Sequence, residues 1–200
     1  MFVEKPVREL LDAFASPNPT PGGGSASALA SATGAALLQM VASLPKTRTN
    51  SDADRAALTG AANALTGLRE QLTEAIDADS RAYDQVVAAY RLPKSTDTEK
   101  SARSGAIQRA LHAATDVPLG VARLSADALK HADIVAAHGH SGASSDVGVA
   151  IALLRAGQRG ALLNVEINLG GIEDAAYVSA VRAEAGRLAH HSAKREGGAT

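Results

Sequence analysis

The segment "PTPGGGSASALASATGAALLQM", residues 19–40, decides how this chain folds, because it joins three glycines to a run of almost exclusively small side chains. Proline lacks a backbone donor and disfavours helix in the residue before it, so the stretch "SPNPTPGGG" predicts an extended turn. Ser25 is then a suitable N-cap for a helix that continues to about Leu44 and ends at Pro45. A phosphate-binding loop, a membrane segment and a surface for close helix packing are the alternatives for this turn and helix.

The residue pattern separates these alternatives. "GGGS" lacks the Gly-Lys-Ser/Thr ending of a P-loop and the strand context of a dinucleotide-binding fold, so it indicates nucleotide binding only weakly. No run of 18 uninterrupted apolar residues occurs, which argues against a membrane span. The small residues are spaced as on a helix-packing surface (Ser27, Ser31, Gly34 and Ala35). We therefore expect close helix packing, with the amides of the glycine turn open to a ligand.

Composition predicts a soluble all-α protein of one domain, residues 1–200. The 200 residues are 46% hydrophobic but only 2% aromatic, so alanine and aliphatic side chains must fill the core. Alanine favours helix because it loses no side-chain entropy there. We expect a bundle of about seven to eight helices with one long central helix.

Charge composition and the N-terminal sequence limit which binding partners and which cellular compartment we expect. Lys and Arg total 20 against 21 Asp and Glu, so no basic excess indicates a nucleic-acid partner. The chain has no cysteine, which fits a reducing compartment. The opening "MFVEKPVREL" has no apolar signal region, so we expect a cytoplasmic protein with no membrane partner.

Periodicity and capping signals divide the rest of the chain. The expected helices run over residues 2–15, 25–44, 51–92, 98–114, 118–138, from about 146, and 173–193. Thr96 or Ser95 with Glu99 predicts a capping box, and Pro118 fits the first turn of a new helix. The segment "LLNVEINL" alternates like a strand, but we expect helix because a lone strand would leave its backbone unpaired. The tail "REGGAT" is typical of disorder.

One acidic residue interrupts the apolar ridge of the long helix. The ridge consists of Leu65, Leu68, Leu72, Ile76, Tyr83, Val86 and Tyr90. Asp79 occupies a ridge position with no cation three or four residues away, whereas Asp77 has Arg81 four residues on and fits a solvated ion pair. A carboxylate on an apolar face either has partners from another helix or titrates abnormally. Asp79 is thus a candidate catalytic acid or base, or a structural acceptor for a helix terminus or an arginine.

The other polar motifs indicate a functional site less strongly. Asn164 and Asn168 lie on one face of the expected helix, where two amides in an apolar run need partners from the fold or from a ligand. "SSD" at 144–146 fits a plain N-cap. The "HGH" motif at 138–140 lacks helical metal-ligand spacing, so we expect no metal site, and no Ser-His-Asp or thiol signature appears.

Several segments in order resemble one family. These are "PTPGGGSASALASATGAALLQMV", "DADSRAYDQVVAAYRLPKSTDTEK", "ATDVPL", "SSDVGVA" and "GALLNVEINL". Together they resemble formiminotetrahydrofolate cyclodeaminases and stand-alone methenyltetrahydrofolate cyclohydrolases, from about Val7 to Arg195. The resemblance implies an all-helical homodimer or higher homo-oligomer that takes a tetrahydrofolate derivative as substrate and needs no cofactor.

The resemblance also implies site residues. Asp79 matches the family's catalytic acidic position. The matching substrate-binding positions are Pro21, Gly22, Gly23, Gly24, Ser25, Ser145, Asp146, Asn164 and Asn168, to which Arg48 is added. Where the family has Thr-x-Gly and a basic run, this chain has "PKTRTNS" and keeps only Lys46 and Arg48; its second loop has Gly139-His140 in place of Gly-Asn.

The function expected from the resemblance is hydrolysis of 5,10-methenyltetrahydrofolate to 10-formyltetrahydrofolate, with Asp79 as general acid and base. The first alternative is cyclodeamination of 5-formiminotetrahydrofolate with release of ammonia. The second, motivated by the missing basic run, is a folate-binding or structural helical protein without catalysis.

Overall fold

A computed structural model describes residues 1–194, and the tail expected to be disordered (195–200) lies outside the described residues. The described part contains six α-helices, two short 3₁₀ helices and no strand. The α-helices are α1 (Val7–Ala15), α2 (Gly23–Ala42), α3 (Asp52–Tyr90), α4 (Asp97–His138), α5 (Ser144–Leu169) and α6 (Ala175–Lys194); the 3₁₀ helices are η1 (Phe2–Glu4) and η2 (Ser141–Ala143). The predicted all-α class is confirmed, with fewer helices than the seven to eight expected.

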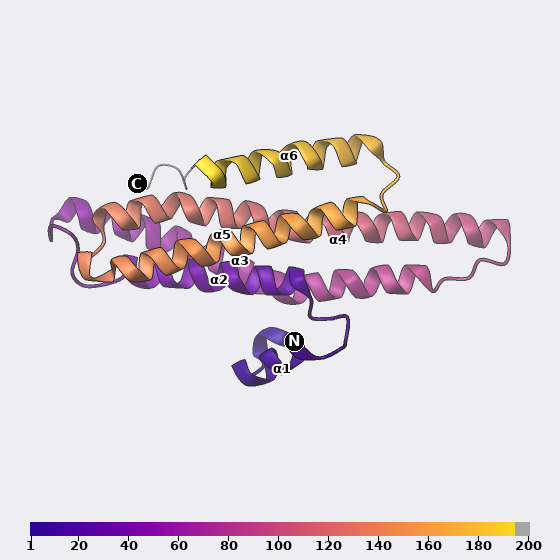
Figure 1. The fold of residues 1–200 in the computed structure, drawn as a ribbon, viewed down its shortest axis with the longest axis horizontal. Coiled ribbons are helices and arrows are strands. Elements are labelled where there is room, and N and C mark those ends of the chain that lie inside the picture. Colours follow the sequence, from indigo (N-terminus) through magenta and orange to yellow (C-terminus); the bar gives the residue numbers. More distant parts are fainter. Residues whose placement is uncertain (195–200) are drawn as a thin grey trace.

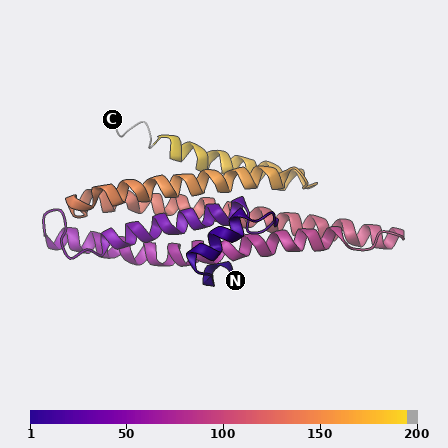
Figure 2. The same cartoon turned by 60° about the horizontal axis from the view of Figure 1, so that its bottom comes forward.

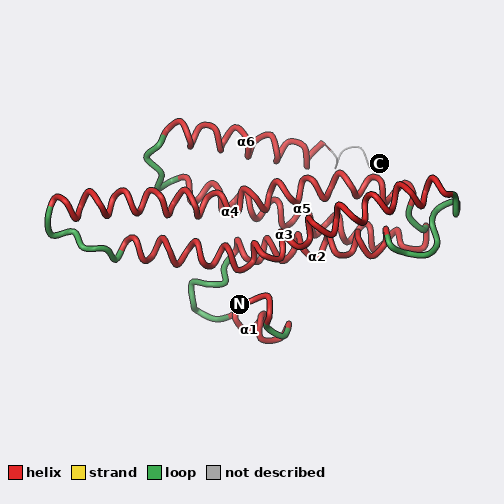
Figure 3. Tube along the Cα trace, turned by 180° about the vertical axis from the view of Figure 1, so that it is seen from behind, coloured by secondary structure: helices red, strands yellow, loops and turns green. Residues whose placement is uncertain are grey.

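Helices α2 to α5 form an antiparallel four-helix bundle in which each helix packs on its neighbours in chain order and α5 closes onto α2. Helix α6 lies along one side of this bundle and α1 along the opposite side (Figures 1 and 2). Helices α3 and α4, with 39 and 42 residues, are much longer than α2 and α5, so their hairpin projects beyond the bundle (Figure 3). The chain thus has two long helices where one was expected.

Helix α4 runs without interruption through Pro118, so the expectation of a new helix at this residue is wrong. Proline inside a helix leaves the carbonyl four residues earlier without its usual donor. Here that carbonyl belongs to Ala114, and it accepts a hydrogen bond of 2.7 Å from the Asn168 side chain of α5. A neighbouring helix therefore supplies the missing donor, and two expected helices become one.

The small residues of α2 serve close helix packing, as predicted. A side chain at Gly157 of α5 would overlap Ser31, and one at Gly34 would lie 2.7 Å from the Ala150 carbonyl oxygen. Ser31 and Ser125 are buried and their hydroxyl oxygens lie 2.7 Å apart. Helix α2 is long and apolar enough to cross a membrane, but 56% of that window is buried inside the bundle, as for a core helix.

The alternating segment "LLNVEINL" is helical and forms the end of α5, as expected. In a helix, residues two apart point to nearly opposite sides, so the alternating apolar residues of this segment are divided between two faces. Val165 and Leu169 are buried in the core, whereas Leu163 and Ile167 are 62% and 77% exposed. The second apolar face is therefore left uncovered in a single chain.

The prediction of an ion pair between Asp77 and Arg81 is wrong. Asp77 is only 6% exposed, and its carboxylate accepts hydrogen bonds from the backbone nitrogens of Phe2 (2.6 Å) and Val3 (3.4 Å). The carboxylate thus caps η1, which begins at Phe2. The helix expected over residues 2–15 is divided into η1 and α1 because Pro6 intervenes. The capping box of Thr96 and Glu99 at the start of α4 is present as predicted.

Candidate active site

The glycine turn meets Asp79 at the point where α2 begins. Helix α2 starts at Gly23 with Gly22 as its N-cap, so Ser25 is the third helical residue and not the N-cap that was expected. The backbone nitrogen of Ser25 donates a 2.8 Å hydrogen bond to Oδ2 of Asp79. Since no side chain of α2 caps its own N-terminus, the carboxylate of α3 takes that role.

The two oxygens of the Asp79 carboxylate differ in their surroundings. Oδ2 also lies 2.9 Å from the Ser25 hydroxyl, whose single proton is shared between this oxygen and the Ile76 carbonyl oxygen at the same distance. Within residues 1–194, Oδ1 accepts no hydrogen bond; it lies against Gly24, where an added Cβ would overlap it. One oxygen is thus anchored and the other is available for proton transfer.

Burial raises the pKa of Asp79 above the ordinary value of an aspartate, because it penalises the charged form. The two hydrogen bonds from Ser25 act in the opposite direction but are the smaller effect. The N-terminus of α2 carries a partial positive charge that also favours the carboxylate. A carboxyl group whose pKa moves toward neutrality is better suited to give and take protons.

Asn164 and Asn168 reach the same end of the bundle from α5. A Cβ at Gly23 would lie 3.5 Å from Nδ2 of Asn164, so this side chain adjoins the glycine turn. Asn164 donates to the Gly160 carbonyl within its own helix, at 2.8 Å. The amide nitrogen of Asn168 uses one of its two hydrogens for Ala114, as described above, and its side-chain oxygen accepts no hydrogen bond among the described residues.

Pro21 is buried beside this cluster, and its peptide bond with Thr20 is cis. The structure thus brings together one set of the predicted residues: Pro21, Gly22, Gly23, Gly24, Ser25, Asp79, Asn164 and Asn168. We call this set the glycine-turn cluster.

The remaining predicted residues lie at the opposite end of the bundle. Ser145 and Asp146 belong to the first turn of α5, about 27 Å along the helix from Asn164 at 1.5 Å per residue. The prediction that "SSD" caps this helix is wrong, since its N-cap is Ala143 and no side chain caps it. The Arg48 guanidinium donates a hydrogen bond of 2.8 Å to the Ala136 carbonyl oxygen. Within one chain, these residues and Asp79 do not form a single site.

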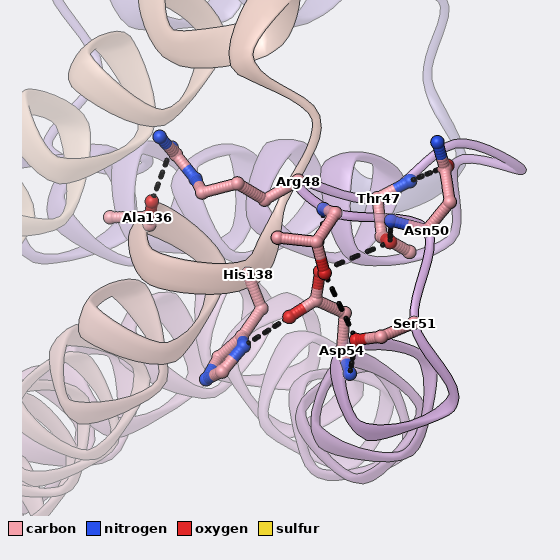
Figure 4. Close-up of polar contacts among 8 residues, drawn as sticks. Thr47, Arg48, Asn50, Ser51, Asp54, Ala136 and His138 are labelled. Carbon is pink, nitrogen blue, oxygen red and sulfur yellow. Dashed lines mark hydrogen bonds and ion pairs between the residues drawn. The ribbon is translucent and has the colours of Figure 1, made fainter.

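Near Arg48, the structure contains a polar cluster that the sequence analysis missed (Figure 4). The Asp54 carboxylate contacts Nδ1 of His138 at 2.7 Å and accepts hydrogen bonds from Thr49 at 2.7 and 2.8 Å. These bonds, that from His138 first, hold the pKa of Asp54 well below its usual range. Because Asp54 and His138 are 84 residues apart in the chain, no local spacing signals the pair.

No group of three or more His, Cys, Asp or Glu side chains that could hold a metal ion occurs in the described part of the chain. Of the polar groups in the glycine-turn cluster, only Asp79 titrates in the acidic to neutral range. The arrangement therefore offers one proton-transferring carboxyl group next to backbone and amide groups that can orient a polar substrate.

Comparisons with known proteins agree on one family. The sequence profile of the formiminotransferase-cyclodeaminase family matches residues 6–187. The chain is 42% identical over 189 residues to a methenyltetrahydrofolate cyclohydrolase from Methylorubrum extorquens, covering 91% of both proteins. It is 33% identical to the formimidoyltransferase-cyclodeaminase of Sus scrofa, of which the match covers 34%.

A solved structure supports the same relationship. The crystal structure of a formiminotetrahydrofolate cyclodeaminase from Thermotoga maritima superposes with a TM-score of 0.85 at 26% sequence identity, covering 96% of this chain and 91% of the other. Both the sequence profile and the fold extend over nearly the whole chain. The chain therefore belongs to the formiminotransferase-cyclodeaminase family.

Proposed function

We propose that this protein hydrolyses 5,10-methenyltetrahydrofolate to 10-formyltetrahydrofolate. The observation that carries the proposal is the half-buried Asp79 carboxylate, which Ser25 anchors through one oxygen while the other accepts no hydrogen bond among the described residues. The 42% identical relative, which matches over 91% of both chains, is named a methenyltetrahydrofolate cyclohydrolase, and this supports the methenyl substrate over others of the family.

The proposed reaction needs one carboxyl group and water. The substrate carries a cationic carbon between two nitrogens, and an adjacent carboxylate stabilises this charge. Asp79 takes a proton from water as the water oxygen bonds to that carbon. The carbon–N5 bond then breaks, Asp79 returns the proton to N5, and the hydroxyl proton leaves to solvent as the formyl carbonyl forms. One proton is released overall, and no redox or metal cofactor enters the proposal.

The glycine-turn cluster orients the substrate in this proposal. The free side-chain oxygen of Asn168 and the amide of Asn164 can bond the polar edge of the pterin, and Gly24 lets the Asp79 carboxylate approach the N-terminus of α2 closely. We retain a cytoplasmic location as a prediction.

We further propose that the active protein is a homodimer whose copies share each site. Val149, Leu163 and Ile167 are exposed apolar residues on the face of α5 that also carries Ser145, so this uncovered face extends along the helix. A two-fold axis that lies in the plane of contact, perpendicular to the axis of α5, sets the two α5 helices antiparallel, and this is the arrangement that we propose. It would bring Ser145 and Asp146 of one copy toward the glycine-turn cluster of the other, joining the two sets of predicted residues.

The test of the function is an assay of purified protein with both folate substrates. Hydrolysis is followed by loss of the near-ultraviolet absorbance of 5,10-methenyltetrahydrofolate, measured against its spontaneous decay. We expect enzyme-dependent turnover of this substrate. A folded protein that turns over neither substrate would overturn the enzymatic proposal.

A second candidate is cyclodeamination of 5-formiminotetrahydrofolate. It is favoured by the name of the structural neighbour from Thermotoga maritima. In that reaction Asp79 would protonate the departing ammonia. Release of ammonia from 5-formiminotetrahydrofolate, faster than turnover of the methenyl compound, would select this alternative.

A further inference from the structure

A cavity of about 410 Å³ lies between α4, α5 and α6, in the part of the bundle that α6 covers. Its apolar wall includes Leu129, Leu188 and Ala126. The volume is within the range of small-molecule sites. None of its lining residues comes from α2 or α3, which carry the glycine turn and Asp79.

The polar wall of this cavity is positively charged. It contains four cations, Arg123, Lys130, Arg155 and Arg187, against two carboxylates, Asp127 and Glu184. The carboxylates are both engaged within the wall. Lys130 lies 2.7 Å from Asp127, and Arg123 binds both oxygens of Glu184 at 2.6 and 2.7 Å. Arg187 adds to the positive field that lowers the pKa of Glu184.

Arg155 is a cation of this wall that takes part in neither of these two ion pairs. Its Nε atom is buried, yet it has no hydrogen-bond partner among the described residues. Burying such a donor without an acceptor is costly. The Arg155 side chain lines the cavity and makes no ion pair or hydrogen bond within residues 1–194, so its guanidinium charge is left to be matched by an anion in the cavity. Gln158, one turn further along α5, is almost fully buried in the same wall.

We propose that this cavity is a second ligand site, which binds a small organic monocarboxylate with an apolar body. The carboxylate pairs with Arg155, and the apolar body packs on Leu129, Leu188 and Ala126. The net positive charge of the lining selects the anion, because a neutral compound of the same shape can offer Arg155 only an uncharged acceptor and loses the attraction between opposite charges. The site is separate from Asp79 and does not depend on the proposed function.

The test is titration calorimetry of the full chain with 2-naphthoate and with its neutral analogue 2-naphthamide. We expect saturable binding of 2-naphthoate and at least about tenfold weaker binding of 2-naphthamide, because the amide carbonyl makes a neutral hydrogen bond with Arg155 in place of a charge-assisted one. Arg155→Met keeps an unbranched apolar stem but removes the guanidinium charge, and it should weaken 2-naphthoate about tenfold while weakening 2-naphthamide much less.

The matched control is Arg159→Met, on an exposed position of the same helix, which should bind 2-naphthoate like the unaltered chain. Ala126→Phe fills the cavity and should abolish binding of both compounds, and Asp79→Asn should leave 2-naphthoate binding intact. Absence of saturable binding, equal affinities for the two compounds, equal effects of Arg155→Met and Arg159→Met, or loss of binding in Asp79→Asn would overturn the proposal.

Discussion

Asn168 of α5 donates its side-chain amide to the Ala114 carbonyl of α4, at 2.7 Å, and so replaces the backbone donor that Pro118 lacks. A buried carbonyl without a donor costs about 1–3 kcal/mol, so this single bond supports the continuity of a 42-residue helix. It also assigns to Asn168 a structural role beside any contact with substrate.

This hydrogen bond predicts that substitutions of Asn168 and Pro118 have coupled effects on the free energy of unfolding. Asn168→Ala should lower the free energy of unfolding by about 1–2 kcal/mol, because the Ala114 carbonyl loses its donor. In a Pro118→Ala background, the restored backbone N–H serves that carbonyl, so the same change should cost about 1 kcal/mol less. A double-mutant cycle in urea, at fixed protein concentration, measures the difference; equal costs in both backgrounds would contradict the assignment.

Asp79→Asn should lower kcat for the methenyl substrate at least about a hundredfold, because it removes the proposed proton carrier. Because burial raises the pKa of Asp79, activity should fall with decreasing pH already above the ordinary aspartate range near 4. The measurements are kcat/KM against pH and circular dichroism. Asp84→Asn, on an exposed position of α3, is the control and should stay active. Unchanged turnover in Asp79→Asn would move the catalytic role elsewhere.

Gly24→Ala should impair turnover, because the added Cβ would overlap the Asp79 carboxylate. We expect a loss of about tenfold or more in kcat, since displacing a catalytic group by a fraction of an ångström is enough for such an effect. Gly60→Ala in α3 is the matched control: nothing lies within 4 Å of its added Cβ, and it should raise stability by about 1 kcal/mol. Full activity of Gly24→Ala would argue against close contact at the reacting carboxylate.

Asp54→Ala should destabilise the protein at neutral pH and much less in acid. The pKa of Asp54 is lower in the folded than in the unfolded chain, so its stabilising effect is complete above about pH 4 and is lost as the pH falls through the folded-state pKa. Urea midpoints measured from neutral to acidic pH should therefore converge for the two proteins. A constant difference across this range would show that the pair with His138 does not act electrostatically.

The shared site predicts complementation between two inactive variants. Asp79→Asn and Asp146→Asn should each be inactive alone. A heterodimer purified by two different tags carries one intact site of two, so it should recover about half of the unaltered activity. Ile167→Glu should separate the copies in sedimentation, whereas Ser101→Glu, on an exposed position of α4, should not. Full activity of a monomeric Ile167→Glu protein would exclude a shared site.

Much of the fold and part of the site could be predicted from local sequence. Alanine content favours helix through the propensity of single residues, and the capping box at Thr96 depends on residues three apart. The periodic ridge of α3 is buried at Leu65, Leu72 and Ile76, whereas Tyr83 and Tyr90 are exposed. The same periodicity placed Asp79 on an apolar face, where the structure has it half-buried beside the glycine turn. A helix terminus was one of the partners expected for Asp79, and the structure confirms it; which helix would supply that terminus could not be predicted.

Other features depend on contacts between distant residues, and for these the sequence carried the wrong signal or none. Arg81 lies at ion-pair spacing from Asp77, but the carboxylate bonds the backbone of Phe2. Asp54 and His138 meet only because α3 begins where α4 ends. Short-range spacing thus determined which residues are helical and which polar side chains lie on an apolar helix face. The partners of those side chains were decided by tertiary structure, because hydrogen bonds between helices join residues whose separation along the chain has no fixed period.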